Sequence, residues 1–135
     1  MFVLDCSVAL AWCLADEQSD YADKVLDLLM QQQAIVPSLW HLEIANVLLM
    51  AQKRGRVTQQ NSATILQTLS NANIITHKRN PTIADIDFVY FAHKHQLTSY
   101  DASYLYLAKT EKIPLATLDK KLTKVANDIG LFLSV

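Results

Sequence analysis

Residues 1–12 read MFVLDCSVALAW, in which a single carboxylate, Asp5, interrupts an otherwise apolar stretch. The apolar residues Phe2–Leu4 include a β-branched valine and predict a short buried strand, and Ser7–Leu14 predicts a helix that follows directly. Asp5 therefore stands where a strand turns into a helix. In α/β proteins, ligand sites gather at this end of the strands. The position of Asp5 makes it the first candidate for a functional residue.

The composition predicts one soluble, cytoplasmic domain covering residues 1–135. The chain has 135 residues, of which 51% are hydrophobic, enough for one sizeable core and too few for two ordinary domains. The apolar stretch Val8–Leu14 is far shorter than the roughly 18 residues of a membrane span. The start of the chain lacks the positive charge of a secretory signal. Cys6 and Cys13 are expected about 10.5 Å apart on one helix, too far for a disulfide. The absence of other cysteines is consistent with a reducing compartment.

Several classes of protein are excluded by what the sequence lacks. Gly55 and Gly130 are the only glycines, so the chain has no glycine-rich loop for a nucleotide phosphate. P-loop and dinucleotide-binding proteins are thereby excluded. No pair of cysteines or histidines has the spacing of a zinc finger.

Short apolar segments alternate with longer helical patterns along the rest of the chain. Strands are expected at 34–36, 74–76, 115–117 and 131–133, and helices at 19–33, 38–54, 58–72, 82–96, 99–112 and 120–129. Gly55 is expected to end the helix before it, and Pro81 to precede the start of another. This alternation predicts an α/β sandwich around a mostly parallel sheet.

Four acidic residues are placed where a site would form. Asp5 and Asp119 follow two expected strands, Asp101 lies in the first turn of a helix, and Glu43 lies within an apolar helical stretch. In a parallel sheet the first two share an edge, where helix starts also lie. Converging carboxylates repel one another unless a divalent cation neutralises them, and oxygen ligands select Mg²⁺ or Mn²⁺ over zinc. Such a site activates water and stabilises a phosphoryl group during hydrolysis.

Each of these acids also has a purely structural explanation. Asp119 can cap the helix that follows it, and Asp5 can cap the helix that begins at Cys6. Asp101 can favour the positive end of its helix dipole. Glu43 can lie on a solvated stripe of its helix. The choice depends on whether the four side chains meet in space.

Four blocks of sequence resemble the motifs of a known family. They are VLDCSVALAW, PSLWHLEIANVLL, LTSYDASYLYLA and IPLATLDKKL, and their order and separations are similar to those of PIN-domain nucleases, in particular VapC-like toxins of type II toxin–antitoxin systems. The resemblance covers nearly the whole chain. It implies a PIN-like three-layer α/β/α sandwich that cleaves RNA with Mg²⁺ or Mn²⁺. It also implies a homodimer and a small cognate antitoxin that covers the acidic groove.

The resemblance also implies roles for individual side chains. Asp5, Glu43, Asp101 and Asp119 match the catalytic acids of the family, in chain order. Asp5 and Asp101 are expected to bind the metal ion directly.

Four further residues stand beside these acids. Ser7 and Thr117 match hydroxyl residues of the family and are expected to orient Asp5 or a bound water. Asn46 lies one helical turn beyond the matched glutamate and can hold the outer shell of the metal, although a structural role fits equally well. Cys6 departs from the family, which more often has a small hydroxyl residue or alanine there.

The surface outside the acids is mildly basic. Without the four acids, nine acidic side chains remain against twelve lysines and arginines. Ordinary solvated side chains and an RNA-steering surface are both compatible with this balance. The basic residues concerned are Lys53, Arg54, Arg56, Lys78, Arg79, Lys120, Lys121 and Lys124.

Three tyrosines, Tyr100, Tyr104 and Tyr106, lie close to Asp101 in the sequence. Packing in the core or in a dimer is the favoured explanation, and base stacking is the alternative.

Together these features predict a Mg²⁺-dependent endoribonuclease that hydrolyses RNA phosphodiester bonds as the toxin of a toxin–antitoxin pair. The alternative is a non-catalytic PIN-like domain that binds a protein or an RNA.

Overall fold

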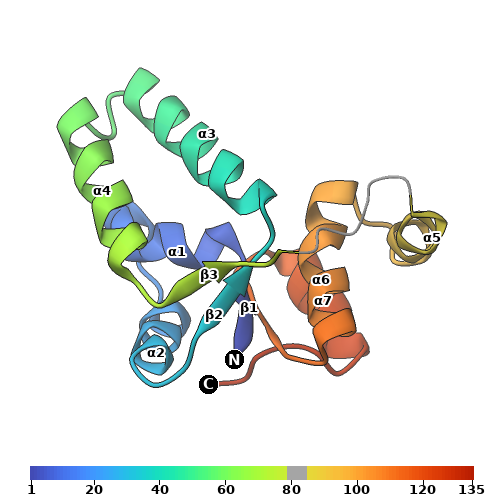
Figure 1. The fold of residues 1–135 in the computed structure, drawn as a ribbon. Helices are drawn as coiled ribbons and strands as arrows, with labels where there is room; N and C mark the ends of the chain where they lie inside the picture. Colours follow the sequence, from blue (N-terminus) through green and yellow to red (C-terminus); the bar gives the residue numbers. More distant parts are fainter. Residues whose placement is uncertain (79–84) are drawn as a thin grey trace.

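The computed structural model describes residues 1–78 and 85–135, whose four strands form one parallel sheet (Figure 1). The strands are β1 (Phe2–Leu4), β2 (Ala34–Val36), β3 (Ile74–Thr76) and β4 (Leu115–Ala116). The helices are α1 (Cys6–Cys13), α2 (Asp20–Leu29), α3 (Leu39–Lys53), α4 (Gln59–Asn71), α5 (Ile86–Lys94), α6 (Ser99–Glu111) and α7 (Lys120–Asp128), with a 3₁₀ helix, η1, at Ala15–Glu17.

The sheet reverses its direction of growth at β1. The strand order is β3-β2-β1-β4, and Val3 pairs with Ile35 of β2 and with Leu115 of β4. The chain first adds β2 and β3 on one side of β1 and then returns to add β4 on the other. Because parallel crossovers are right-handed, this reversal places helices on both faces. Figure 1 shows α1 and α2 on one face and α6 and α7 on the other, which confirms the predicted three-layer sandwich.

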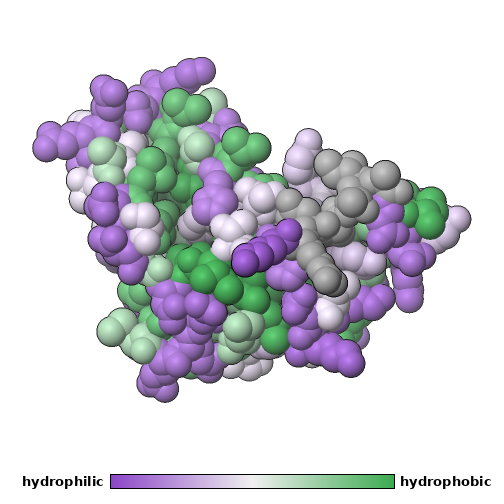
Figure 2. Space-filling view, in the orientation of Figure 1, coloured by the Kyte–Doolittle hydropathy of each residue, from purple (hydrophilic) through white to green (hydrophobic). Residues whose placement is uncertain are grey.

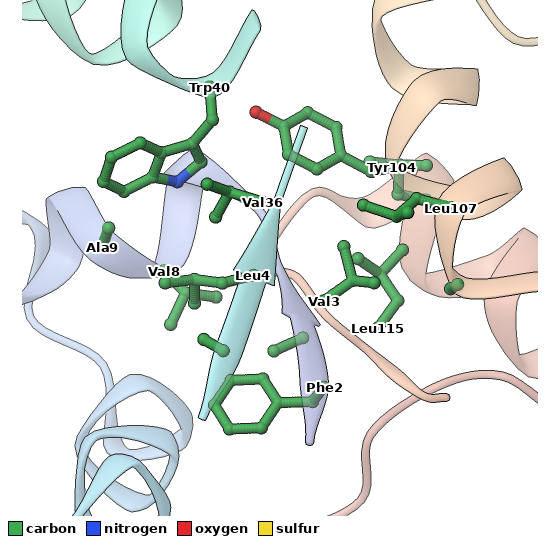
Figure 3. Packing of buried hydrophobic residues seen from close by; sticks show 14 of the residues in the cluster. Phe2, Val3, Leu4, Val8, Ala9, Val36, Trp40, Tyr104, Leu107 and Leu115 are labelled. Carbon is green, nitrogen blue, oxygen red and sulfur yellow. The ribbon is translucent and has the colours of Figure 1, made fainter. Parts of the chain in front are cut away.

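The core is built on β1, which has no exposed side chain. Successive residues of a strand point to opposite faces. Val3 points toward Leu107 and Leu115, whereas Leu4 points toward Val8 (Figure 3). Both faces of β1 are therefore buried, which explains why the strand is apolar throughout instead of alternating with polar residues.

Two predicted helices differ from the observed ones. The helix expected over 19–33 ends at Leu29, because the N–H groups of Gln31 and Gln32 both turn back to the carbonyl of Leu28 before β2 begins. The helix expected over 82–96 is observed as α5, from Ile86 to Lys94. Its expected start and the preceding proline lie in 79–84, outside the described residues.

The strands near the end of the chain are shorter than expected. The strand expected at 115–117 ends at Ala116. The prediction of a strand at 131–133 is wrong, because this segment forms only a single parallel bridge, between Phe132 and Leu115. Because β4 has only two residues, the segment 131–133 pairs with Leu115 alone: the N–H of Leu115 donates to the carbonyl of Leu131, and the N–H of Leu133 donates to the carbonyl of Leu115.

Helices α3 and α4 form a hairpin that projects from the sheet (Figure 1). The turn between them begins at Gly55, whose φ of 71° lies in the left-handed region. The N–H of Gly55 bonds the carbonyl of Gln52, and the N–H of Arg56 bonds that of Ala51. This pair of bonds closes the end of α3 where the sequence predicted it.

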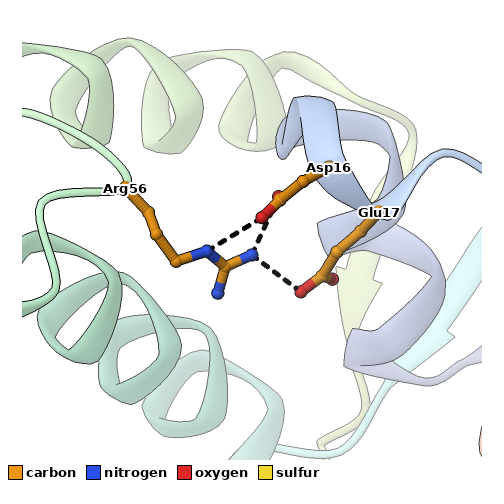
Figure 4. Close-up of polar contacts among 3 residues, drawn as sticks. All are labelled: Asp16, Glu17 and Arg56. Atoms are coloured by element: carbon orange, nitrogen blue, oxygen red, sulfur yellow. Dashed lines mark hydrogen bonds and ion pairs between the residues drawn. The ribbon is translucent and has the colours of Figure 1, made fainter.

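The same turn is attached to η1, which follows α1, by a cluster of charges (Figure 4). The Arg56 guanidinium donates two hydrogen bonds to Asp16, at 3.0 and 2.8 Å, and one to Glu17, at 3.2 Å. The three side chains lie on the surface, so their attraction is screened by salt and contributes little to stability. Their effect is to fix the turn of the hairpin against η1.

Two expectations from composition can be compared with the structure. Cys6 and Cys13 are both free thiols on α1, as their spacing predicted. Among the described residues, no helix is both long enough and apolar enough to cross a bilayer.

We expect Leu4→Ala to lower the free energy of unfolding by about 2–5 kcal/mol, because Leu4 is fully buried and truncation leaves a cavity. Urea unfolding monitored by circular dichroism measures this change. Met30→Ala is the control, since Met30 is 85% exposed and its truncation should cost less than about 0.5 kcal/mol. Equal losses in the two variants would contradict the placement of the core.

Candidate functional site

The candidate site lies at the carboxyl ends of β1 and β4, where the sheet changes direction. Neighbouring connections leave on opposite faces at such a point, which opens a crevice suited to a ligand. Asp5 directly follows β1, and its N–H donates to the carbonyl of Ala116 at 3.0 Å. Asp119 follows β4, and Glu43 and Asp101 lie in the N-terminal parts of α3 and α6. All four predicted acids therefore belong to segments that begin near this edge.

Asp5 is a buried carboxylate with two hydroxyl partners. It is 4% exposed, and its Oδ2 accepts hydrogen bonds from Ser7 Oγ and Thr117 Oγ1, each at 2.7 Å. Burial raises the pKa of Asp5 above its ordinary value of 3.8, although the two hydroxyl bonds oppose this. Asp5 occupies the N-cap position of α1, but its side chain makes no capping hydrogen bond there, so capping does not account for its two hydroxyl partners.

Both hydroxyls also bind the loop that follows β4. Ser7 Oγ accepts from the N–H of Leu118 at 3.0 Å, and Thr117 Oγ1 accepts from the N–H of Asp119 at 3.1 Å. Each hydroxyl thus bridges the carboxylate to a backbone amide. We call this set of four hydrogen bonds the hydroxyl bridge. It fastens the end of β1 to the end of β4.

Asp119 is exposed and caps α7. Its Oδ1 accepts a hydrogen bond from the N–H of Leu122 at 2.9 Å, so the structural explanation given for this residue holds. Its charge nevertheless acts on the other acids, because it helps to raise the pKa of both Asp5 and Asp101. Capping and membership of the acidic edge are therefore compatible.

Asp101 is half-buried in the first turn of α6, where its N–H donates to Thr98 Oγ1 at 3.2 Å. Its pKa is raised by burial first and then by the charges of Asp119 and Asp5. Lys121 partly offsets this effect. Asp101 therefore lies within electrostatic reach of two acids that come from opposite ends of the chain.

Glu43 is half-buried, and its Oε1 accepts a hydrogen bond from the Tyr104 hydroxyl. Burial raises the pKa of Glu43, and the charges of Asp5 and Asp101 raise it further. A solvated stripe does not explain this position. Tyr104 was expected to pack in the core or in a dimer, with base stacking as the alternative, and its hydroxyl is the contact that sequence reasoning missed. Its spacing of three residues from Asp101, on one face of a helix, is the signal that points to it.

The two remaining candidates differ in their surroundings. Asn46 is exposed on α3 and makes no side-chain hydrogen bond within the described residues. Cys6 is half-buried beside Asp5 and Tyr104, and burial raises the pKa of its thiol. The thiol is therefore protonated at neutral pH.

The donor set has the chemistry of a site for a hard cation. The pKa values of Asp5, Glu43 and Asp101 are all raised, and no salt bridge joins any of the four acids to a base in 1–78 or 85–135. Within those residues, no three acidic, histidine or cysteine side chains form a group that could hold a metal ion by themselves. Mg²⁺ is usually bound by one or two carboxylates, with water in its other positions. The residues present fit that mode of binding.

The basic residues proposed for RNA are not equivalent. Arg56 is occupied by Asp16 and Glu17, and Lys124 lies 3.9 Å from Asp128 on the same helix. Arg79 lies outside the described residues. Among the basic residues that the structure describes, Lys121 is the one whose charge acts on an acid of the site.

A family model, the PIN domain, matches residues 2–128. The chain therefore belongs to the PIN domain family. No curated protein sequence matches the chain.

Solved structures share this fold. The crystal structure of PAE2754 from Pyrobaculum aerophilum has a TM-score of 0.71 and 22% identity, covering 91% of this chain and 82% of the other. A toxin–antitoxin complex from Klebsiella pneumoniae has a TM-score of 0.61 and 18% identity, covering 90% and 88%. The structure of FitAcB from Neisseria gonorrhoeae has a TM-score of 0.64 and 16% identity, covering 94% of both chains. At these identities the likeness shows the fold alone.

We expect Thr117→Val to lower the free energy of unfolding by about 1–3 kcal/mol, because it removes partners from a buried carboxylate and an amide. Chemical unfolding measures the change. Thr64→Val is the matched control, since the exposed Thr64 hydroxyl bonds only the carbonyl of Gln60 within its own helix. A loss no larger than that of the control would contradict the hydroxyl bridge.

The raised pKa of Asp5 predicts a stability difference that depends on pH. A carboxyl whose pKa is raised by folding destabilises the fold once it is ionised, and this penalty disappears as the pH falls toward 3.8. In EDTA, Asp5→Asn should therefore be more stable than the wild type at pH 7, and the difference should shrink toward pH 4. Urea unfolding at a series of pH values measures it. A variant less stable than the wild type at pH 7 would refute the assignment.

Proposed function

We propose that this PIN-domain protein is a Mg²⁺-dependent endoribonuclease that hydrolyses RNA phosphodiester bonds, with Mn²⁺ as a substitute ion. The observation that carries the proposal is the set of acids at the switch point: burial first, and then the charges of neighbouring acids, raise the pKa values of Asp5, Glu43 and Asp101, with no salt bridge to a base among the described residues. A fold alone has no use for uncompensated carboxylates that raise one another's pKa. A bound divalent cation and a phosphodiester substrate would explain why these carboxylates are present.

Each acid has a distinct role in this proposal. Asp5 and Asp101 hold the ion, and the hydroxyl bridge keeps Asp5 Oδ2 fixed while they do so. The ion supplies activation of water and stabilisation of the charge that develops on the phosphate. Glu43 and Asp119 complete the acidic edge and orient the attacking water, with Asn46 as an outer contact. The chain thus provides binding and orientation, and no covalent intermediate with the protein is needed.

The start of α7 provides a docking point for the RNA backbone. Lys120 and Lys121 are exposed in its first turn, directly after Asp119. Lysine side chains attract the phosphates of an RNA backbone. A phosphodiester held by these groups lies next to the acids. Binding of RNA should accordingly weaken as the salt concentration rises.

A protein partner is supported by apolar side chains on the projecting hairpin. Leu42 and Leu49 of α3 are 75% and 57% exposed, and Leu66 of α4 is 48% exposed. Figure 2 shows apolar patches on this part of the surface. Exposed apolar patches mark interaction surfaces. We assign them to a second copy of the chain and a small antitoxin, since a structural neighbour is a toxin–antitoxin complex. Cytoplasmic action follows from an RNA substrate.

Cleavage of an end-labelled RNA tests the proposal. The wild type should cleave with Mg²⁺ and stop in EDTA, and Asp5→Asn and Asp101→Asn should each lower the rate at least about 100-fold. Asp27→Asn, an exposed acid on α2, is the matched control and should cleave like the wild type. Millimolar Mg²⁺ should also raise the melting temperature of the wild type more than that of either site variant.

Cleavage that survives EDTA, or survives in both site variants, would overturn the mechanism. Folded protein with neither cleavage nor a melting shift would instead favour the non-catalytic binding domain.

A further inference from the structure

We propose that Tyr104 is the positioning residue for Glu43: its hydroxyl holds the Glu43 carboxylate in place at the acidic edge before metal and RNA bind. The inference rests on the proposed function, because it adds a residue to that reaction. It concerns a side chain that packs in the core and contacts neither substrate nor ion.

The direction of the hydroxyl is fixed by the core. Tyr104 is 0% exposed, and its Oη donates to Glu43 Oε1. Figure 3 shows the phenol oxygen directed away from α6 and toward the base of α3. Because a close-packed interior prevents the ring from turning freely, the oxygen has one direction available. Helix α6 thereby supplies both Asp101 and the donor that places an acid of another helix.

Glu43 needs such a partner more than the other acids do. Its side chain has three rotatable bonds, and ordering a glutamate costs up to about 2 kcal/mol of conformational entropy. It belongs to the projecting hairpin and is repelled by Asp5 and Asp101. Repulsion would turn a free glutamate outward to solvent. A hydrogen bond from a neutral phenol holds the carboxylate without cancelling the charge that a cation requires.

Packing alone does not explain the hydroxyl. A phenylalanine would fill the same space, and a buried phenol costs free energy unless its O–H finds a partner. That partner here is an acid whose pKa is raised by burial first and then by the charges of Asp5 and Asp101. Asp5 has its hydroxyl bridge and Asp119 its cap, so Tyr104 plays the corresponding role for Glu43.

Tyr104→Phe should lower kcat for RNA cleavage about 10- to 100-fold, a loss of the size caused by removing outer-shell partners at metal sites, because Glu43 would no longer be held where it orients the attacking water. KM for RNA should stay within about twofold, because Tyr104 does not contact RNA. Tyr21→Phe is the matched control: it removes a phenol whose hydroxyl donates to the carbonyl of Leu133 at 2.8 Å. Both variants should melt a few degrees lower, and only Tyr104→Phe should lose kcat.

A double-mutant cycle separates positioning from a general structural effect. If Tyr104 acts through Glu43, then Tyr104→Phe should change kcat by less than about twofold in a Glu43→Ala background. An undiminished loss in that background would overturn the proposal. So would a kcat for Tyr104→Phe equal to that of Tyr21→Phe.

Nuclear magnetic resonance tests the contact without relying on cleavage. The chain has three glutamates, Glu17, Glu43 and Glu111, so ¹³C-labelled glutamate gives three carboxyl signals. The Glu43 signal should shift in Tyr104→Phe and not in Tyr21→Phe. An inactive wild type would overturn the proposed function, and this shift would still decide whether Tyr104 places Glu43.

If Tyr104→Phe does not fold, ¹³C-labelled tyrosine in Glu43→Ala reports on the same bond from the other side. A shifted Tyr104 signal supports the inference, and an unchanged one overturns it.

Discussion

The molecule depends on one buried carboxylate that is held by neutral groups. Burial destabilises the ionised form of Asp5, and hydrogen bonds from Ser7 and Thr117 stabilise it again in part. The same two hydroxyls take up amides of the loop after β4, so the carboxylate and the loop fix each other. A lysine or arginine in place of Ser7 or Thr117 would have neutralised the charge of Asp5. Hydroxyls organise this edge of the sheet and leave its negative charge intact.

Most of the fold could be predicted from the sequence because the sheet is parallel and covered on both faces. Its strands then read as short, continuous apolar runs, and β1, β2 and β3 have the expected bounds. The helix end at Gly55 followed from its freedom to adopt a positive φ. Where the prediction failed, the decisive forces were not local. The segment 131–133 is apolar enough for a strand, but β4 beside it offers only Leu115 as a partner.

The candidate site was less accessible to sequence reasoning. The positions of Asp5 and Asp119 follow from strand ends, and their resemblance to family motifs pointed to the same residues. The contact between Glu43 and Tyr104 joins residues 61 positions apart, and a tyrosine within an apolar helix reads as core. For Arg56 the sequence left an RNA-steering role and an ordinary solvated side chain both open, and the side chain instead binds acids 39 and 40 positions away. Contacts of this kind depend on how the helices pack against one another, and local sequence patterns do not predict that packing.

The attachments at the two ends of the molecule respond differently to their medium. Between β1 and β4, buried hydrogen bonds join the Asp5 carboxylate, two hydroxyls and backbone amides, and salt screens buried contacts much less than exposed ones. At the turn between α3 and α4, the Arg56 guanidinium binds two surface carboxylates, Asp16 and Glu17. Dissolved ions screen this attraction, with a Debye length of about 8 Å at physiological ionic strength. A higher salt concentration should therefore loosen the attachment of the α3–α4 turn to η1 and leave the hydroxyl bridge between β1 and β4 unchanged.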